Sequence, residues 1–220
     1  MKTILCYGDS NTWGFMPFHE KPPVKANNRF PRDVRWTGLL QKELGEDYLV
    51  IEEGLNGRTT MFDCFMEERR NGLKEIDLCL LTHLPIDLVI LMLVTNDTKQ
   101  AFAKSPYLIA QGMRRLAERV KSGGYGPNGA APEVLMVAPA RLNEGIFTSW
   151  LSDEFDADSL ARDRALAKEY ARAAADCGAH FLDAGAQISA DNADGVHMNA
   201  EGHKAMAALI CGKVREILVD

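Results

Sequence analysis

The sequence has no hydrophobic run long enough to cross a membrane. Its longest unbroken apolar stretch is residues 88–94, whereas a membrane helix needs about 20 residues. The opening residues MKTILCYG contain too short an apolar stretch for a secretion signal, and no small-residue cleavage site follows. We therefore expect a cytoplasmic protein with no membrane partner.

An excess of positive charge is also absent. Lys and Arg number 25 against 31 Asp and Glu, which gives a net charge of −6 and a pI near 5.4. Proteins that bind nucleic acids or anionic lipid surfaces need clustered Lys and Arg to neutralise phosphates. The composition therefore argues against both kinds of partner.

Paired cysteines are missing as well. The five cysteines are scattered, odd in number and never spaced as CxxC; they are Cys6, Cys64, Cys79, Cys177 and Cys211. We expect neither disulfides nor a zinc site, and interpret the cysteines as buried free thiols.

What the chain does contain is an alternation of short apolar runs and amphipathic stretches. Residues 3–7, 48–53, 87–94, 133–138 and 180–183 are typical of buried strands. Residues 33–44, 105–121, 158–176 and 199–218 are typical of helices, with Ser105 and Asn199 as N-caps. This order predicts an α/β protein with a parallel sheet covered by helices on both faces. Without repeats or a linker, residues 1–220 are predicted to form a single domain.

Small and polar residues follow several of the predicted strands. Ligands of open parallel sheets bind at the carboxyl ends of the strands, so these residues are expected to meet at one edge. The residues concerned are 8–11 (GDSN), 54–58 (GLNGR), 95–97 (TND) and 183–185 (DAG), together with 194–197 (DGVH) before the last helix.

These residue types are the parts of a Ser-His-Asp hydrolase. His197 is suited to take the proton of Ser10, and Asp194, three residues earlier, is suited to orient the imidazole. The oxyanion needs fixed donors. The backbone N–H groups of Ser10 and Gly57 and the side-chain amide of Asn96 are candidates for that role.

Each of these residues has a simpler structural interpretation. Ser10 or Asp9 would serve as a helix N-cap, and Asn96 as an Asx-turn residue. Gly57 would only permit a turn, and His197 would only begin a helix. Asp183 is a second carboxylate of suitable type, although as a strand-end residue it better fits a turn. It is the combination of these residues at one edge that favours catalysis.

The order of the blocks GDS (8–10), Gly57, ND (96–97) and DGVH (194–197) resembles the SGNH (GDSL-like) hydrolases. The resemblance runs from residue 4 to the last helix. Longer stretches resemble the bacterial arylesterase/acyltransferase group within that family. They are ILCYGDSNTWG (4–14), DVRWTG (33–38), VIEEGL (50–55), THLP (82–85) with DLVI (87–90), and TNDTK (95–99).

The resemblance implies a flavodoxin-like three-layer α/β/α sandwich with a five-stranded parallel sheet, the SGNH hydrolase fold. It implies a serine esterase that acts on short-chain or aryl esters through an acyl-serine, with neither metal nor cofactor. Ser10 would be the nucleophile, His197 the base and Asp194 its orienter, while Ser10, Gly57 and Asn96 would form the oxyanion hole. Members also transfer acyl groups to alcohols or hydrogen peroxide, and the most similar ones are homo-octamers.

Two positions depart from the family pattern. Val94 stands where the third block has glycine. If the loop needs the positive φ of glycine, Asn96 is displaced and the oxyanion hole is weakened; if φ is negative, Val94 only narrows the pocket floor or extends the strand packing. Asn11 replaces an apolar residue beside the nucleophile and is expected to make the acyl pocket more polar. The predicted substrate-binding residues are Asn11, Phe15, Val94, Thr95, Lys99 and Val196. Trp150 and Phe155 are further candidate pocket walls, and for Trp13 core packing is favoured.

Three other functions stay open at this point. A carbohydrate acetyl esterase or a lysophospholipase would use the same chemistry. A flavodoxin-like module that binds a ligand without catalysis would share only the scaffold.

Overall fold

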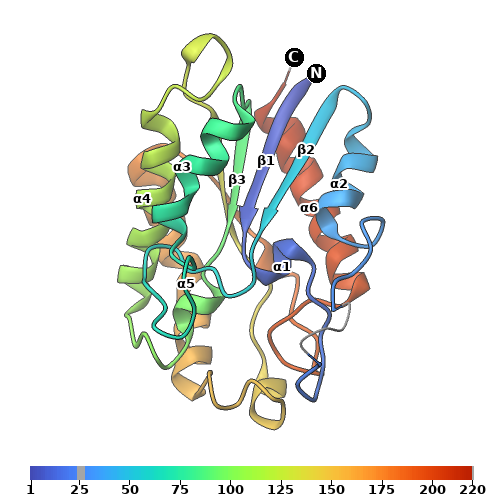
Figure 1. The fold of residues 1–220 in the computed structure, drawn as a ribbon, viewed down its shortest axis with the longest axis vertical. Helices are drawn as coiled ribbons and strands as arrows, with labels where there is room; N and C mark the ends of the chain where they lie inside the picture. The colour runs from blue at the N-terminus through green and yellow to red at the C-terminus, as the bar shows by residue number, and fades with distance from the viewer. Residues whose placement is uncertain (24–27, 220) are drawn as a thin grey trace.

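The computed structural model describes residues 1–23 and 28–219. At its centre lies a five-stranded parallel sheet of order β2-β1-β3-β4-β5 (Figure 1). The strands are β1 (Lys2–Gly8), β2 (Tyr48–Gly54), β3 (Leu88–Met92), β4 (Glu133–Ala138) and β5 (His180–Asp183). Every neighbouring pair is parallel, so the predicted parallel sheet is confirmed.

Helices cover both faces of the sheet (Figure 1). On one face, α2 (Trp36–Leu44) and α6 (Ala200–Ile217) pack against Ile4 and Ile90. On the other face, α3 (Gly72–His83), α4 (Pro106–Ser122) and α5 (Ala157–Cys177) pack against Leu5 and Leu91. Successive strand residues face opposite layers, which explains why residues 4–7 of β1 and the whole of β3 are apolar and buried. The predicted three-layer α/β/α arrangement is confirmed.

The predicted helix starts are only partly right. Ser105 and Asn199 are N-caps as expected, since their side chains accept the N–H groups of Leu108 (3.3 Å) and Gly202 (2.9 Å). The helix predicted from residue 33 begins only at Trp36, because residues 32–34 form a turn.

Helix α3 was not predicted at all. Its apolar residues lie on more than one side, since Ile76 and Leu80 are buried while Leu78 and Leu81 are exposed. A helix that is apolar on several faces shows no clear 3.6-residue period. The apolar pattern of residues 72–83 therefore does not predict a helix there.

The remaining features are local. The segments 16–23, 28–32 and 140–156 are irregular apart from the 3₁₀ turn at Glu144–Thr148 and single bridges at Arg29 and Arg141. Residues 24–27 lie outside the described part. All five cysteines are free, but Cys64 and Cys177 are only half-buried. Among the described helices, none combines the length and apolar character of a membrane span.

Candidate active site

Ser10 lies immediately after β1, at the carboxyl end of the sheet. It is the first residue of the short helix α1 (Ser10–Trp13), which Figure 1 shows below the arrowheads of β1 and β2. Asp9 is the N-cap of this helix and accepts the N–H of Asn11 at 3.0 Å. The capping interpretation therefore applies to Asp9 and not to Ser10, whose hydroxyl contacts another partner.

That partner is His197. Its Nε2 lies 3.0 Å from Ser10 Oγ, and its Nδ1 lies 2.7 Å from Asp194 Oδ2. All three side chains are buried, although 187 residues separate Ser10 from His197. A base in contact with a hydroxyl on one side and a carboxylate on the other is the geometry that activates a serine.

Asp194 is held in its ionised form. It is fully buried and accepts four hydrogen bonds: from the backbone N–H groups of Phe18, Val196 and His197 and from the His197 ring. Burial alone would raise the pKa of this carboxyl, but the bonds from His197 and Val196 outweigh it and lower the pKa. Gly195 allows the tight loop, since its φ is 71° and a Cβ would lie 2.4 Å from the Ile146 nitrogen.

The loops that carry the oxyanion candidates Gly57 and Asn96 are joined to each other and to the end of β1. The loop after β2 is tied to the end of β1, because the N–H of Leu55 and the guanidinium of Arg58 both donate to the Gly8 carbonyl, at 3.1 and 2.9 Å. Asn96 joins this loop through a 3.0 Å bond from its Nδ2 to the Arg58 carbonyl. The N–H groups of Ser10 and Gly57 donate to no other residue that the structure describes.

Val94 adopts the conformation that glycine would favour. Its φ is 118° and its ψ is −34°, yet Asn96 keeps its bond to Arg58. Of the two alternatives at this position, the positive φ is the one the structure shows, and the bond to Arg58 holds the Asn96 side chain beside the loop that carries Gly57. Val94 is also no pocket residue, since its side chain is fully buried in the core between the sheet and α4. The strain of a β-branched residue at this φ is balanced by the burial of its methyl groups.

This strain predicts an unusual order of stability at position 94. Alanine is normally more stable than glycine by about 0.5–1 kcal/mol. Here we expect Val94→Gly to be more stable than Val94→Ala by about 1 kcal/mol or more, because only glycine escapes the positive-φ penalty. Urea unfolding of both variants measures the difference. If Val94→Ala has the larger free energy of unfolding, as is usual for alanine, the backbone at Val94 is not strained.

A pair of buried carboxyl groups lies behind the site. Asp97 accepts the Thr60 N–H at 3.0 Å and the Thr60 hydroxyl at 2.5 Å. Burial raises the pKa of Asp97 to about 7, with a further contribution from the Asp9 carboxyl, against the Thr60 bonds that lower it. Burial likewise raises the pKa of Asp9 to about 6.

A raised carboxyl pKa makes the folded state hold its proton more tightly than the unfolded chain does. The resulting stability is present below about pH 4 and is lost as pH rises towards 7. Asp97→Asn keeps an acceptor for Thr60 and cannot ionise. We expect its stability relative to the native protein to rise by roughly 2–4 kcal/mol between pH 4 and 8.

Urea midpoints of both proteins across this pH range measure that change. Asp158→Asn is the matched control, since the Asp158 side chain is 80% exposed. A stability difference that does not vary with pH would contradict the buried, proton-holding carboxyl at Asp97.

Among the predicted substrate-binding residues, Phe15 packs against the ring of the base. Its ring centroid lies 4.6 Å from that of His197. Thr95 and Val196 are buried. Lys99 pairs with Glu154 at 2.5 Å. Asn11 is also buried, with both ends of its amide bonded to the backbone beside His197, so the expected polar acyl pocket is wrong.

The other aromatic residues considered as pocket walls differ in whether they contact Phe15. Trp150 packs against Phe15 with ring centroids 6.4 Å apart, whereas Phe155 is buried in a small apolar cluster. Trp13 is only half-buried, under the Arg29 guanidinium at 4.9 Å, so core packing is the wrong interpretation. Asp183 pairs with Arg141 at 3.2 Å and does not contact His197.

Two contributors to the site were missed. Arg58 lies buried over the Tyr7 ring, 4.0 Å from its centroid, and bonds the Gly8 carbonyl. The Phe18 N–H supports Asp194 at 3.3 Å. Neither leaves a local signal, because the partners are far away in the sequence. In the part of the chain that the structure describes, no cluster of His, Cys, Asp or Glu is arranged to hold a metal ion.

Comparison with known proteins agrees with this geometry. The model of the GDSL-like Lipase/Acylhydrolase family matches residues 6–205. The chain belongs to the GDSL-like lipase/acylhydrolase family. No curated protein sequence matches it at a significant level.

Solved structures of this family are similar over the whole chain. The M. smegmatis aryl esterase is 40% identical with a TM-score of 0.92, over 99% of this chain and 100% of that one. Est24, a carbohydrate acetylesterase from Sinorhizobium meliloti, is 37% identical with a TM-score of 0.88, over 99% and 100%. With these relatives, this GDSL-like hydrolase is an enzyme that hydrolyses carboxylic esters.

Proposed function

We propose that this hydrolase cleaves short-chain or aryl esters through an acyl-serine intermediate formed on Ser10. The observation that carries the proposal is the continuous contact from Ser10 Oγ to His197 Nε2 (3.0 Å) and from His197 Nδ1 to Asp194 (2.7 Å). The whole chain is taken as one catalytic domain.

In the first half-reaction, Ser10 Oγ attacks the ester carbonyl carbon while His197 Nε2 takes its proton. The oxyanion accepts hydrogen bonds from the N–H groups of Ser10 and Gly57 and from the Asn96 amide. Asp194 stabilises the imidazolium, which then protonates the leaving alcohol. In the second half-reaction, His197 takes a proton from water, water attacks the acyl carbon, and Ser10 regains its proton as the acid leaves.

The preference for aryl or short acyl groups rests on the aromatic surface beside the base. Phe15, Phe18 and Trp150 form a continuous contact, with Phe15 at 6.1 Å from Phe18 and 6.4 Å from Trp150. Aromatic rings of a substrate pack well against such a wall. An alcohol or hydrogen peroxide entering in place of water would give acyl transfer or perhydrolysis.

Carbohydrate acetyl esterase activity is the second candidate, because the acetylesterase from S. meliloti is 37% identical to this chain. Comparing kcat/KM for acetylated sugars with kcat/KM for p-nitrophenyl acetate distinguishes a carbohydrate acetyl esterase from an aryl esterase. A lysophospholipase would instead cleave lysolipids, and a module that only binds would cleave none of these esters.

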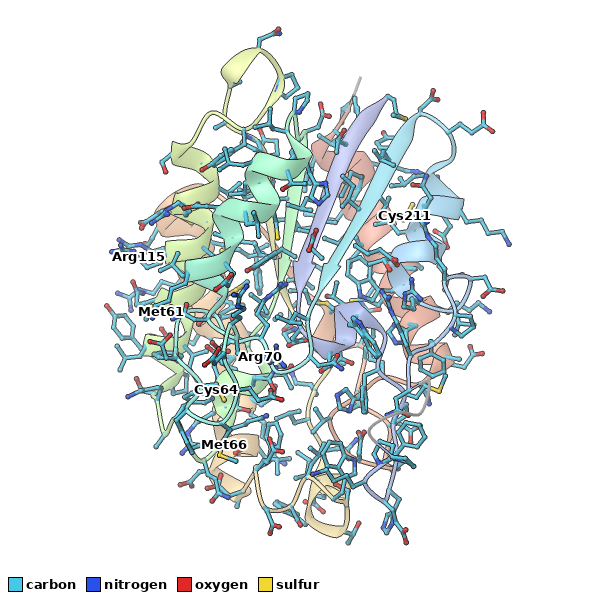
Figure 2. The ribbon with its side chains drawn as sticks, in the orientation of Figure 1. Met61, Cys64, Met66, Arg70, Arg115 and Cys211 are labelled. Atoms are coloured by element: carbon cyan, nitrogen blue, oxygen red, sulfur yellow. The ribbon has the colours of Figure 1, made fainter. Side chains whose placement is uncertain are left out.

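We also propose that the protein is a cytoplasmic homo-oligomer, an octamer by its resemblance to other members. Exposed apolar side chains support association: Phe65 and Met66 are 77% and 76% exposed, and Leu78 on α3 is 68% exposed. Figure 2 places Met66 at the periphery, on the loop before α3. Light scattering of the native protein and of Phe65→Ser/Met66→Ser tests this, and a monomeric native protein would overturn it.

Labelling with a fluorophosphonate tests the catalytic proposal directly, because only an activated serine reacts. We expect one adduct per chain by intact mass, located on Ser10 by peptide mapping. Folded protein that takes up no label, or takes it up at another serine, would refute the proposed function.

A further inference from the structure

Asn11 connects the helix of the nucleophile to the loop of the base. Its side chain is 1% exposed. Its Nδ2 donates to the Val196 carbonyl at 3.2 Å, and its Oδ1 accepts the Met198 N–H at 3.0 Å. One amide group therefore bonds to the backbone on both sides of His197.

Asn11 therefore links the backbone that carries Ser10 to the backbone that carries His197. Asn11 is covalently next to Ser10, and its own N–H is anchored on Asp9 Oδ1 at 3.0 Å. Through Val196 and Met198, the same residue determines where the backbone of His197 lies relative to Ser10. The other anchor of that loop, Asp194, bonds the N–H groups of Val196 and His197 at 2.9 Å, and its hydrogen bonds in the described part of the chain do not reach α1.

We infer that Asn11 is a positioning residue that holds His197 Nε2 within hydrogen-bonding distance of Ser10 Oγ. The inference rests on the proposed function. Asn11 does not touch the substrate and donates nothing to the reacting atoms, since both ends of its amide are occupied by buried backbone groups. An apolar side chain of similar size would fill the space but leave the Val196 carbonyl and the Met198 N–H unpaired, so the loop would move to find new partners.

Asn11→Leu tests the inference, with Gln41→Leu as its matched control. Gln41 is also a side-chain amide that bridges backbone groups: it donates to the carbonyls of Gly45 (3.0 Å) and Tyr48 (2.9 Å) and accepts the Val50 N–H (2.8 Å). It lies at the opposite end of the sheet, where β2 begins. Both variants lose hydrogen bonds between a side-chain amide and the backbone, but only Asn11→Leu loses them beside the triad.

We expect Asn11→Leu to lower kcat for p-nitrophenyl acetate by about 10- to 100-fold with little change in KM, because a displacement of about 1 Å between reacting groups has this effect. Gln41→Leu should lower the melting temperature comparably and leave kcat within about twofold. Asn11→Asp, which keeps the acceptor for Met198 and loses the donor to Val196, should also lower kcat at constant KM. If Asn11→Leu retains kcat, or if Gln41→Leu loses as much, the inference is wrong.

A second readout does not depend on turnover. The proton shared by His197 Nδ1 and Asp194 should give a low-field proton NMR signal in the native protein, and Asn11→Leu should shift or broaden it while Gln41→Leu leaves it unchanged. If the native protein has this signal but neither turns over esters nor takes up fluorophosphonate, the proposed function fails. The effect of Asn11→Leu on the signal still tests whether Asn11 positions His197. An unshifted signal in folded Asn11→Leu would overturn the inference.

Discussion

Ser10→Ala is expected to lower kcat for p-nitrophenyl acetate by about 10⁵-fold or more, since removing the nucleophile disables the whole triad. Only a hydroxyl is lost from a side chain that is 6% exposed, so the fold should be retained. Turnover measured beside circular dichroism and a melting curve checks both statements. The native protein with p-nitrophenyl acetate alone gives the background rate.

A Ser10→Ala variant that keeps a substantial share of native turnover would mean that another group attacks the ester. Native turnover no higher than background would instead mean that the site is inactive towards this ester. In that case Val94→Gly, which restores the residue of the family pattern, is the next variant to assay.

Asp194→Asn is expected to lower kcat by about 10⁴-fold near neutral pH. An amide keeps acceptors for the N–H groups of Val196 and His197, so the loop can retain its shape. The amide nitrogen, however, would face His197 Nδ1 as a donor and favour the tautomer with its proton on Nε2. That tautomer cannot take the proton of Ser10.

The measurement is kcat of Asp194→Asn beside Asp183→Asn. Asp183 is the other carboxylate considered from the sequence, and it pairs with Arg141. We expect Asp183→Asn to alter stability rather than kcat. If Asp183→Asn has the larger effect on kcat, the assignment of the orienting carboxylate is wrong.

Several parts of the fold and site were predictable because their signals are local. Continuous apolar runs mark the strands of a parallel sheet buried on both faces, and N-caps such as Ser105 and Asn199 mark helix starts. The residues that follow the strands are polar, and strand direction alone brings them to one edge. In this way Ser10, Asn96 and His197 could be named together before any distance was known.

Other parts depend on contacts between distant segments. Helix α3 exposes Leu78 and Leu81, so its periodicity is obscured. Lys99 was expected at the substrate, but its charge is paired with Glu154, 55 residues away along the chain and 2.5 Å away in space. The backbone conformation at Val94 is set by the loop it begins, which overrides the preference of valine for negative φ.

The sequence by itself therefore determined the class of fold, the edge of the sheet where chemistry occurs and the residue types gathered there. Local propensity, apolar patterning and strand direction are enough for these, because each acts over a few residues. The tertiary structure alone decided that Val94 lies at positive φ and that Asn11 bonds the His197 loop instead of lining a pocket. The bonds of Asn11 cross 185 and 187 residues of the chain, a separation over which the sequence carries no information about distance.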